Sequence, residues 1–345
     1  MNWDYWKDYL VYYYILKYGG LLLLLVWAFS KDPKSVNTIH NFNYPKEDQN
    51  QIRLMSLNMG FAGGMNNLDG AVHSRGKIKR NLLAISEKAK EHDINVLAVQ
   101  EIDLNSRRSW FIDQVKFLAK ECEFPYVAVA ITWNKKWVPY PSTWKLWKHY
   151  GKTLAAQAIF SKHPIISQDI LMFDKPKSRS HLYKLFYLDR LTQFVSLKLP
   201  NGETVSLGNL HLEAFDKDCR QKQSLILMDY ICNNYKDKPL ILAGDFNAIH
   251  PNAKEKGPFP DEPKIIHEND LTLKNIYKLG FLNDIFSEEV RKESEFNTFP
   301  CDTPNRQLDH IFYTKQFTSS SSKVDIFLPP FPSDHRSVIS VFDLR

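Results

Sequence analysis

The chain has 345 residues, 43% of them hydrophobic, and a formal charge of +6. This length accommodates one large α/β domain or two ordinary ones, and the hydrophobic content supports a sizeable core, so the chain is globular. The modest charge permits nucleic acid or lipid headgroups as partners but requires neither. Its four cysteines form no CxxC pair, which argues against a zinc site and against a dense disulfide scaffold.

The stretch from Tyr9 to Phe29 is apolar or aromatic apart from Lys17 and a pair of glycines. As a helix it would span roughly 30 Å, about one bilayer core. Tyrosine and tryptophan at its edges suit a membrane interface. We therefore expect residues 1–30 to form a single-pass membrane anchor. The alternatives are a cleaved signal peptide, with Ala28-Phe29-Ser30 as the cleavage site and a secreted or periplasmic product, and a buried core helix.

Residues 31–50 are rich in Asn, Lys, Asp and Pro and are expected to form a solvated linker. No internal repeat and no separate core segment follows, so we expect residues 51–345 to form one domain. Its first predicted strand, Ile52 to Leu57, ends at Asn58. A loop with four glycines comes next, and this composition disfavours regular structure.

A strand–helix–strand alternation comes next and is typical of layered α/β folds. Apolar side chains recur at helical spacing over Arg75 to His92. The apolar run Val96 to Val99 predicts a strand that leads to Glu101. A helix over Ser106 to Cys122 and a strand over Tyr126 to Ile131 are expected to follow.

The segment between Ile131 and a predicted strand at Leu154 to Phe160 is expected to be a loop rich in tryptophan and lysine. These residues are Trp133, Trp137, Trp144 and Trp147 with Lys135, Lys136, Lys145 and Lys148. Such a loop can insert into a membrane interface or stack on bases beside a phosphate backbone. It can also fold back and bury its own indoles.

The second half of the chain contains a hairpin and further alternating elements. The Asn201-Gly202 step predicts a tight turn between strands at Arg190 to Leu199 and Thr204 to Leu212, which carry His211. The remaining expected elements are a helix over Asp216–Tyr235, a strand over Leu240–Ala243, a helix over 270–279, and strands over Gln307–Tyr313 and Ser337–Phe342.

Asp245 and Asn247 stand two residues apart, just after Gly244 ends the strand from Leu240. In extended geometry both side-chain oxygens lie on one side and can face the same hard cation. Asp and Asn after a strand are also common turn formers. This stretch alone therefore leaves both interpretations open.

Six predicted strand ends carry polar residues. They are Asn58, Glu101, His211, Asp245 with Asn247, Asp309, and Asp334 with His335. In layered α/β sheets the functional crevice forms where such ends meet. A turn, a helix cap or a surface position could account for each residue separately, but unrelated causes are a poor explanation for all six. The pattern predicts one shared site.

In their order along the chain, these motifs resemble the metal-dependent endonuclease/exonuclease/phosphatase superfamily, which includes deoxyribonuclease-like enzymes, sphingomyelinases and inositol-phosphate phosphatases. The resemblance runs from Ile52 to Leu344. It rests on SLN (56–58), VQE (99–101), NLHL (209–212), GDFN (244–247), QLDHIF (307–312) and SDH (333–335). It implies a two-sheet, four-layer α/β sandwich of the deoxyribonuclease-like type, here preceded by one N-terminal hydrophobic helix.

The resemblance also implies a role for each motif residue. The implied Mg²⁺ ligands, with Mn²⁺ as an alternative ion, are Asn58, Glu101 and Asp334. The implied catalytic residues are His211, Asp245, Asn247, Asp309 and His335, and Arg190 is the implied phosphate contact. Asp245 and Asn247 would position the attacking water. His335, polarised by Asp309, would act as base or as stabiliser of the phosphorus centre, and His211 would donate to the scissile phosphate.

The implied activity is metal-dependent hydrolysis of a phosphodiester. With a membrane anchor, a lipid or other membrane-proximal phosphodiester is the favoured substrate; the alternatives are nucleic acid and a non-catalytic binding module on the same fold. No protein partner is expected. Two departures from the family pattern, Gln157 for a common glycine and Lys162 for arginine, leave one wall of the pocket open to interpretation.

Overall fold

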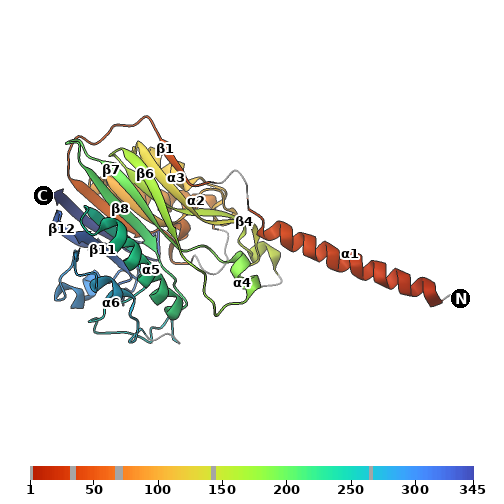
Figure 1. Ribbon diagram of the computed structural model, residues 1–345. Helices are drawn as coiled ribbons and strands as arrows, with labels where there is room; N and C mark the ends of the chain where they lie inside the picture. Colours follow the sequence, from red (N-terminus) through yellow and green to blue (C-terminus); the bar gives the residue numbers. More distant parts are fainter. Residues whose placement is uncertain (1–2, 32–35, 67–72, 141–144, 264–266) are drawn as a thin grey trace.

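Two β-sheets pack face to face at the centre of the molecule, and helices cover their outer faces (Figure 1). This computed structural model describes residues 3–31, 36–66, 73–140, 145–263 and 267–345. The layers confirm the predicted α/β sandwich, and one apolar helix precedes it.

The first sheet has seven strands in the order β1-β4-β5-β3-β2-β13-β12. Their bounds are β1 (Thr38–Asn41), β2 (Ile52–Asn58), β3 (Val96–Asp103), β4 (Tyr126–Val138), β5 (Gly151–Ser161), β12 (Phe317–Asp325) and β13 (Ser337–Leu344). Strands β2 and β3 run parallel, and the other neighbours are antiparallel.

The second sheet has six strands in the order β10-β11-β9-β8-β7-β6. Their bounds are β6 (Ile165–Met172), β7 (Leu191–Lys198), β8 (Thr204–His211), β9 (Leu240–Asp245), β10 (Leu282–Asp284) and β11 (Asp309–Thr314). Strands β8 and β9 are the parallel pair in this sheet. Both parallel pairs direct their carboxyl ends to the site described below.

The helices are α1 (Trp3–Phe29), α2 (Arg75–Glu91), α3 (Gln114–Glu121), α4 (His181–Phe186), α5 (Lys217–Tyr235) and α6 (Thr272–Tyr277). Helix α2 begins where Ser74 accepts a hydrogen bond from the Lys77 N–H. Its buried Ile78, Leu82 and Ile85 recur at helical spacing and pack on the first sheet. Each such side chain contributes about 1.5–3 kcal/mol by burial.

Three apolar layers hold the sandwich together. One lies between the sheets and includes Leu54, Val96 and Ile241. A second lies between the first sheet and helices α2 and α3, and a third lies between the second sheet and α5, where Leu227 and Ile231 are fully buried.

The two ends of the predicted tryptophan- and lysine-rich loop continue the flanking strands, which corrects the expectation of a loop for those ends. Strand β4 runs on to Val138 and pairs with β5, with Trp133 opposite Ala155. The Trp133 ring is buried, packs edge-on against Tyr150 and donates its Nε1–H to the Phe186 carbonyl at 2.8 Å. Burial of this indole stabilises the longer strand. Trp147 is 67% exposed, and Trp144 lies outside the described residues.

Other differences from expectation concern strands at the sheet edges and one helix. Residues 31–50, expected to be linker, include strand β1, which pairs with β4. The expected helix over 106–122 is divided into a short 3-10 turn, Arg107–Ser109, and helix α3. Strands β6, β10 and β12 were not predicted.

Helix α1 projects away from the sandwich (Figure 1). Its segment Tyr12–Phe29 is long and apolar enough to cross a membrane, with mean hydropathy 1.4 and 6% of it buried. A core helix is therefore the wrong interpretation of this segment. Composition and length suit a membrane anchor or a signal sequence alike.

Candidate active site

Strand register brings the predicted site residues together at one edge of the sandwich. In the second sheet, Asp245 pairs with Asp309 on one side and with His211 on the other. In the first sheet, Asn58 pairs with Gln100, which places Glu101 one residue beyond. The two sheets therefore supply opposite walls of a single polar site.

Asp245 is the residue on which the walls converge. Its Oδ2 accepts a hydrogen bond from Asn58 Nδ2 at 3.0 Å and lies 3.4 Å from His211 Nε2 and 3.9 Å from His335 Nε2. Burial, and then the charge of Asp309, raise the pKa of Asp245 to about 6. A carboxylate with this pKa can exchange a proton near neutral pH.

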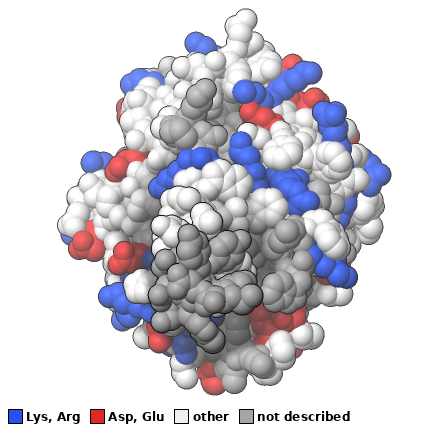
Figure 2. Space-filling model, turned by 90° about the vertical axis from the view of Figure 1, so that its right-hand side faces the viewer, with Lys and Arg blue, Asp and Glu red and all other residues white. Residues whose placement is uncertain are grey.

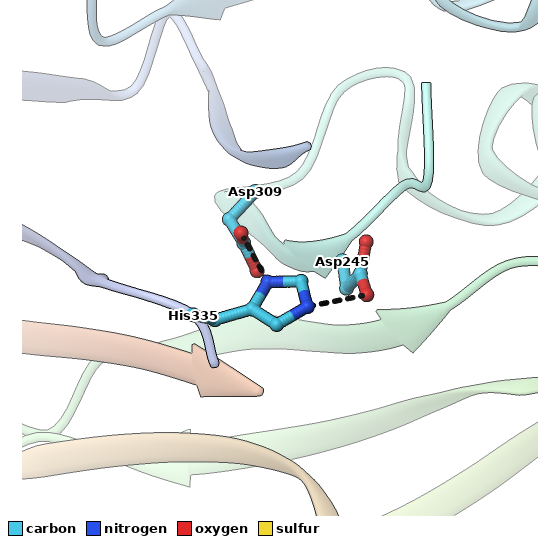
Figure 3. A group of neighbouring side chains, drawn as sticks. All are labelled: Asp245, Asp309 and His335. Atoms are coloured by element: carbon cyan, nitrogen blue, oxygen red, sulfur yellow. Dashed lines mark hydrogen bonds and ion pairs between the residues drawn. The ribbon is translucent and has the colours of Figure 1, made fainter. Parts of the chain in front are cut away.

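His335 and Asp309 form a buried charged pair beside Asp245 (Figure 3). His335 Nδ1 lies 2.8 Å from Asp309 Oδ2. Burial alone would lower the pKa of His335, but the carboxylates of Asp309 and Asp245 raise it to about 10. The ring is therefore an imidazolium at neutral pH, with Nε2 directed toward Asp245.

The turn before His335 is fixed by a serine hydroxyl. Ser333 Oγ donates to the Asn58 carbonyl at 2.6 Å and accepts the His335 N–H at 3.1 Å. This residue ties the SDH motif to the end of strand β2. It also holds Asp334 close to the site, where its charge acts on Glu101.

Gly244 and Asn247 give the GDFN motif its shape. Gly244 has φ +146°, and a Cβ there would lie 2.1 Å from the Leu210 carbonyl oxygen, so only glycine fits. Asn247 adopts φ 50°, a conformation that asparagine tolerates. Its N–H donates to Asp245 Oδ1 at 2.8 Å and its Nδ2 to the Leu212 carbonyl at 3.1 Å. The turn interpretation is therefore confirmed for this motif, and the role of Asn247 in a site stays a prediction.

His211 lies between Asp245 and Arg190. Its Nε2 contacts Arg190 Nη1 and lies 3.9 Å from Glu101 Oε1. Burial, and then the positive charge of Arg190, hold the pKa of His211 well below its usual range. His211 is therefore neutral, and Arg190 is a buried cation inside the site.

Two residues that sequence reasoning missed hold Arg190 in place. Glu213 Oε2 lies 3.9 Å from Arg190 Nε, and Tyr187 donates its hydroxyl to Glu213 Oε1 at 2.8 Å. Both side chains are buried. Glu213 follows His211 by two residues, and that proximity was the one signal that could have identified it.

Buried amides connect the two walls behind the site. Gln100 Nε2 donates to Asn209 Oδ1 at 2.6 Å, and Asn209 Nδ2 donates to the Val99 carbonyl at 3.0 Å. Gln157 Nε2 donates to the Asn209 carbonyl at 3.0 Å. Gln157, which departs from the family pattern, thus joins the sheets rather than facing a ligand.

The carboxylates on the first-sheet side fit a divalent cation. Glu101 has φ 53°, and its side chain is 19% exposed. Burial, and then repulsion from Asp334, raise the pKa of Glu101 to about 7. A hard cation with oxygen ligands would offset that repulsion, and Asn58 Oδ1 lies at the same edge, where it accepts the Gly60 N–H at 3.0 Å.

A second grouping in the described part of the chain also has metal-compatible spacing. Ligand atoms of Asp245, Asp309 and His335 lie within 4.8 Å of one another. His335 Nδ1 is already hydrogen-bonded to Asp309, so only the Nε2 of this ring could bind an ion there. We interpret this group as the His335–Asp309 charge pair beside a second carboxylate, that of Asp245.

Comparison with known proteins defines the class. The model of the Endonuclease/Exonuclease/phosphatase family matches residues 55–335. The chain therefore belongs to this family, whose members generally hydrolyse phosphoester bonds and typically depend on a divalent metal. No curated protein matches the chain.

Solved structures share the fold at low sequence identity. An endonuclease/exonuclease/phosphatase from Beutenbergia cavernae is 19% identical with a TM-score of 0.60, covering 86% of this chain and 72% of its own. The human Nocturnin catalytic domain with bound sulfate is 18% identical with a TM-score of 0.56, covering 92% and 100%. The mannosyl-6-phosphatase Bt3783 of Bacteroides thetaiotaomicron is 17% identical with a TM-score of 0.55, covering 85% and 100%.

Proposed function

We propose that this chain is a divalent-metal-dependent phosphodiester hydrolase that is anchored in a membrane and acts on a lipid or membrane-proximal phosphodiester. The observation that carries the proposal is the convergence of Glu101, His211, Asp245 and the Asp309–His335 pair at one edge of the sandwich. Phosphoryl transfer depends mainly on positioning and on neutralisation of charge, and this edge supplies both.

The residues proposed to hold the metal are Glu101, Asp334 and Asn58, because their side-chain oxygens are hard ligands. The carboxylates of Glu101 and Asp334 repel each other, and a bound cation would offset that repulsion. A bound Mg²⁺, or Mn²⁺ in its place, would supply positive charge to the phosphate oxygens.

The chain's own residues divide the remaining chemistry. The proposed role of Asp245, which accepts hydrogen bonds from Asn58 Nδ2 and the Asn247 N–H, is to orient a water and to accept its proton. The proposed role of the His335 imidazolium, which is hydrogen-bonded to Asp309, is to stabilise negative charge on the phosphorus centre. This arrangement favours the stabilising role of His335 over the role of base.

His211 and Arg190 form the opposite side of the proposed phosphate site. The neutral His211 ring can donate a hydrogen bond to a phosphate oxygen, and the Arg190 guanidinium can add a charge-assisted one. Arg190 is buried and contacts His211, which supports the proposed phosphate contact over a surface role.

Membrane anchoring is proposed from helix α1, whose segment Tyr12–Phe29 extends from the domain with its apolar side chains exposed. A domain held at a bilayer meets lipid phosphodiesters at high local concentration. Nucleic acid is the second candidate substrate, because the family acts on phosphodiesters such as nucleic acids and the chain has a formal charge of +6.

A substrate panel tests the proposal. The full chain in detergent, with Mg²⁺, would be assayed on sphingomyelin, on phosphoinositides and on DNA. We expect hydrolysis of a lipid headgroup. Preferential nicking of DNA would decide for the nuclease, and absence of turnover on every phosphoester would decide for a non-catalytic module.

A further inference from the structure

A basic pocket lies where helix α1 meets the domain. It is formed by the last turn of α1, the C-terminal end of β4, the N-terminal end of β5 and the 3-10 turn Arg107–Ser109. Its volume is about 500 Å³. Four of its lining side chains are cations, namely Arg107, Lys135, Lys136 and Lys152. Neither aspartate nor glutamate lines it in the part of the chain that the structure describes.

The cations of this pocket are half-buried, which makes their mutual repulsion costly. Lys135 Nζ donates to the Phe29 carbonyl at 3.1 Å, which fixes it at the end of α1. Burial, and then the charge of Lys175, lower the pKa of Lys135. The charge of Asp189, which pairs with Lys175 at 2.9 Å, offsets part of this shift, and an anion in the pocket would be attracted to the lining cations.

The wall of the pocket is built by packing and hydrogen bonds. A Cβ on Gly151, which has φ +65°, would lie 2.7 Å from Arg107 Cδ and 3.3 Å from the Trp137 ring. Arg107 Nη2 donates to the Trp147 carbonyl at 3.0 Å. The Lys136 N–H donates to the Ser30 carbonyl at 3.2 Å, which joins the end of α1 to strand β4. The pocket is therefore a preformed feature.

The position of the pocket relates it to a membrane surface. The candidate membrane span ends at Phe29, and Trp27, which lines the pocket, is 47% exposed. Figure 2, which faces this end of the molecule, shows lysine and arginine beside the projecting helix and most acidic residues toward the rim. Tryptophan next to clustered cations is typical of the headgroup level of a bilayer.

We propose that this pocket binds the phosphate-bearing headgroup of an anionic phospholipid in the leaflet that α1 enters. The inference rests on the membrane anchoring given under the proposed function. Arg107 of the pocket is adjacent to Arg108, whose charge acts on Glu101. A bound headgroup would thus hold the catalytic edge at the membrane surface, in addition to the tether that α1 provides.

The test uses the full chain in a nonionic detergent with EDTA, so that no hydrolysis occurs. Dihexanoyl phosphatidylserine, dihexanoyl phosphatidylcholine, inorganic phosphate and a short oligodeoxynucleotide are titrated separately by calorimetry. We expect the phosphatidylserine to bind. In the double variant Lys136→Gln/Lys152→Gln we expect binding to weaken about thirtyfold. Lys120→Gln, an exposed lysine on α3, is the matched control and should bind as the wild type does.

Each remaining outcome overturns the proposal. These are equal binding by the double variant, equal binding of phosphatidylcholine or inorganic phosphate, and a preference for the oligonucleotide. Thermal melting verifies that the variants fold. If the double variant does not fold, the single variants Lys136→Gln and Lys152→Gln are titrated in its place. The double variant should hydrolyse a soluble phosphodiester as the wild type does, and this assay tests the proposed function separately. Intact mass confirms that residues 1–30 are present.

Discussion

Glu101 is the principal ligand of the proposed metal site. Its carboxylate is held near Asp334 and His211 in an environment that favours its neutral form when no cation is bound. If Glu101 binds the metal as proposed, metal binding would stabilise the native state through this residue, since a ligand that binds only the native state stabilises it.

Replacing Glu101 by glutamine should separate its effect on the stability of the fold from its effect on metal binding. In EDTA we expect Glu101→Gln to melt at or above the wild-type temperature, because a buried repulsive charge is removed. With millimolar Mg²⁺ the wild type should gain several degrees and the variant little. Differential scanning calorimetry of both proteins in both buffers measures this. An equal gain by the variant would place the ion elsewhere.

His250 gives a pH prediction outside the proposed metal ligands. It is buried, its Nδ1 accepts the Asn252 N–H at 3.1 Å, and burial, and then the charge of Arg291, lower its pKa to about 4. Below its unfolded pKa near 6.5 the unfolded chain binds the proton first, so stability falls as the pH drops from about 6.5 to about 4.

Substitution of His250 by glutamine should flatten this pH dependence. We expect His250→Gln to be less stable than wild type at pH 7, by about 1 kcal/mol, because the contact with Tyr277 is lost. The difference should shrink by pH 5. Urea unfolding at both pH values measures it, and a difference that grows on acidification would refute the assignment.

How far the sequence predicts the site depends on whether a residue acts through local or tertiary contacts. Asn58, Asp245 and Asp309 were predicted because strand ends meet at one sheet edge, and the structure brings them together there. Tyr187 and Glu213 were not predicted, because Glu213 meets Tyr187 and Arg190 only through tertiary packing, without a periodic or motif signal.

At the scale of elements, the turn after strand β9 depends on Gly244. Gly244→Ala should destabilise the domain by about 3 kcal/mol or more, because the added Cβ meets the Leu210 backbone. Gly202→Ala is the matched control: it also has positive φ, 90°, but nothing lies within 4 Å of the added Cβ. That change should cost about 1 kcal/mol. Equal losses in denaturant unfolding would show that backbone strain, not contact, decides.

The elements that the sequence failed to predict are mainly edge strands. Strands β6 and β12 lie at the ends of their sheets and have partly exposed faces, so they lack a strong apolar alternation. In β12 the hydroxyls of Ser319 and Ser322 are hydrogen-bonded to each other and to Ser340. A serine-rich composition alone is typical of a loop, so this strand is missed from the sequence. Central strands, buried on both faces, carry the clearer apolar signal.

For the molecule as a whole, the N-terminal helix is either a retained membrane anchor or a cleaved signal peptide. We expect the mature protein to retain residues 1–30 and to remain with the membrane after alkaline carbonate extraction. Intact mass of protein from its host membranes measures this. A mature N-terminus at Lys31, in a soluble fraction, would instead identify a cleaved signal peptide and a secreted or periplasmic enzyme.

Glu101 and the Asp309–His335 pair are the residues on which the proposed hydrolysis of a phosphodiester depends. The most direct measurement is release of nitrophenol from bis(4-nitrophenyl) phosphate by the full chain, with Mg²⁺ or with EDTA, beside Glu101→Gln and His335→Asn. We predict turnover that EDTA abolishes and that either substitution reduces by a factor of about 100 or more. Turnover that persists in EDTA, or that either variant retains in full, would show that these residues and the metal do not carry out the hydrolysis.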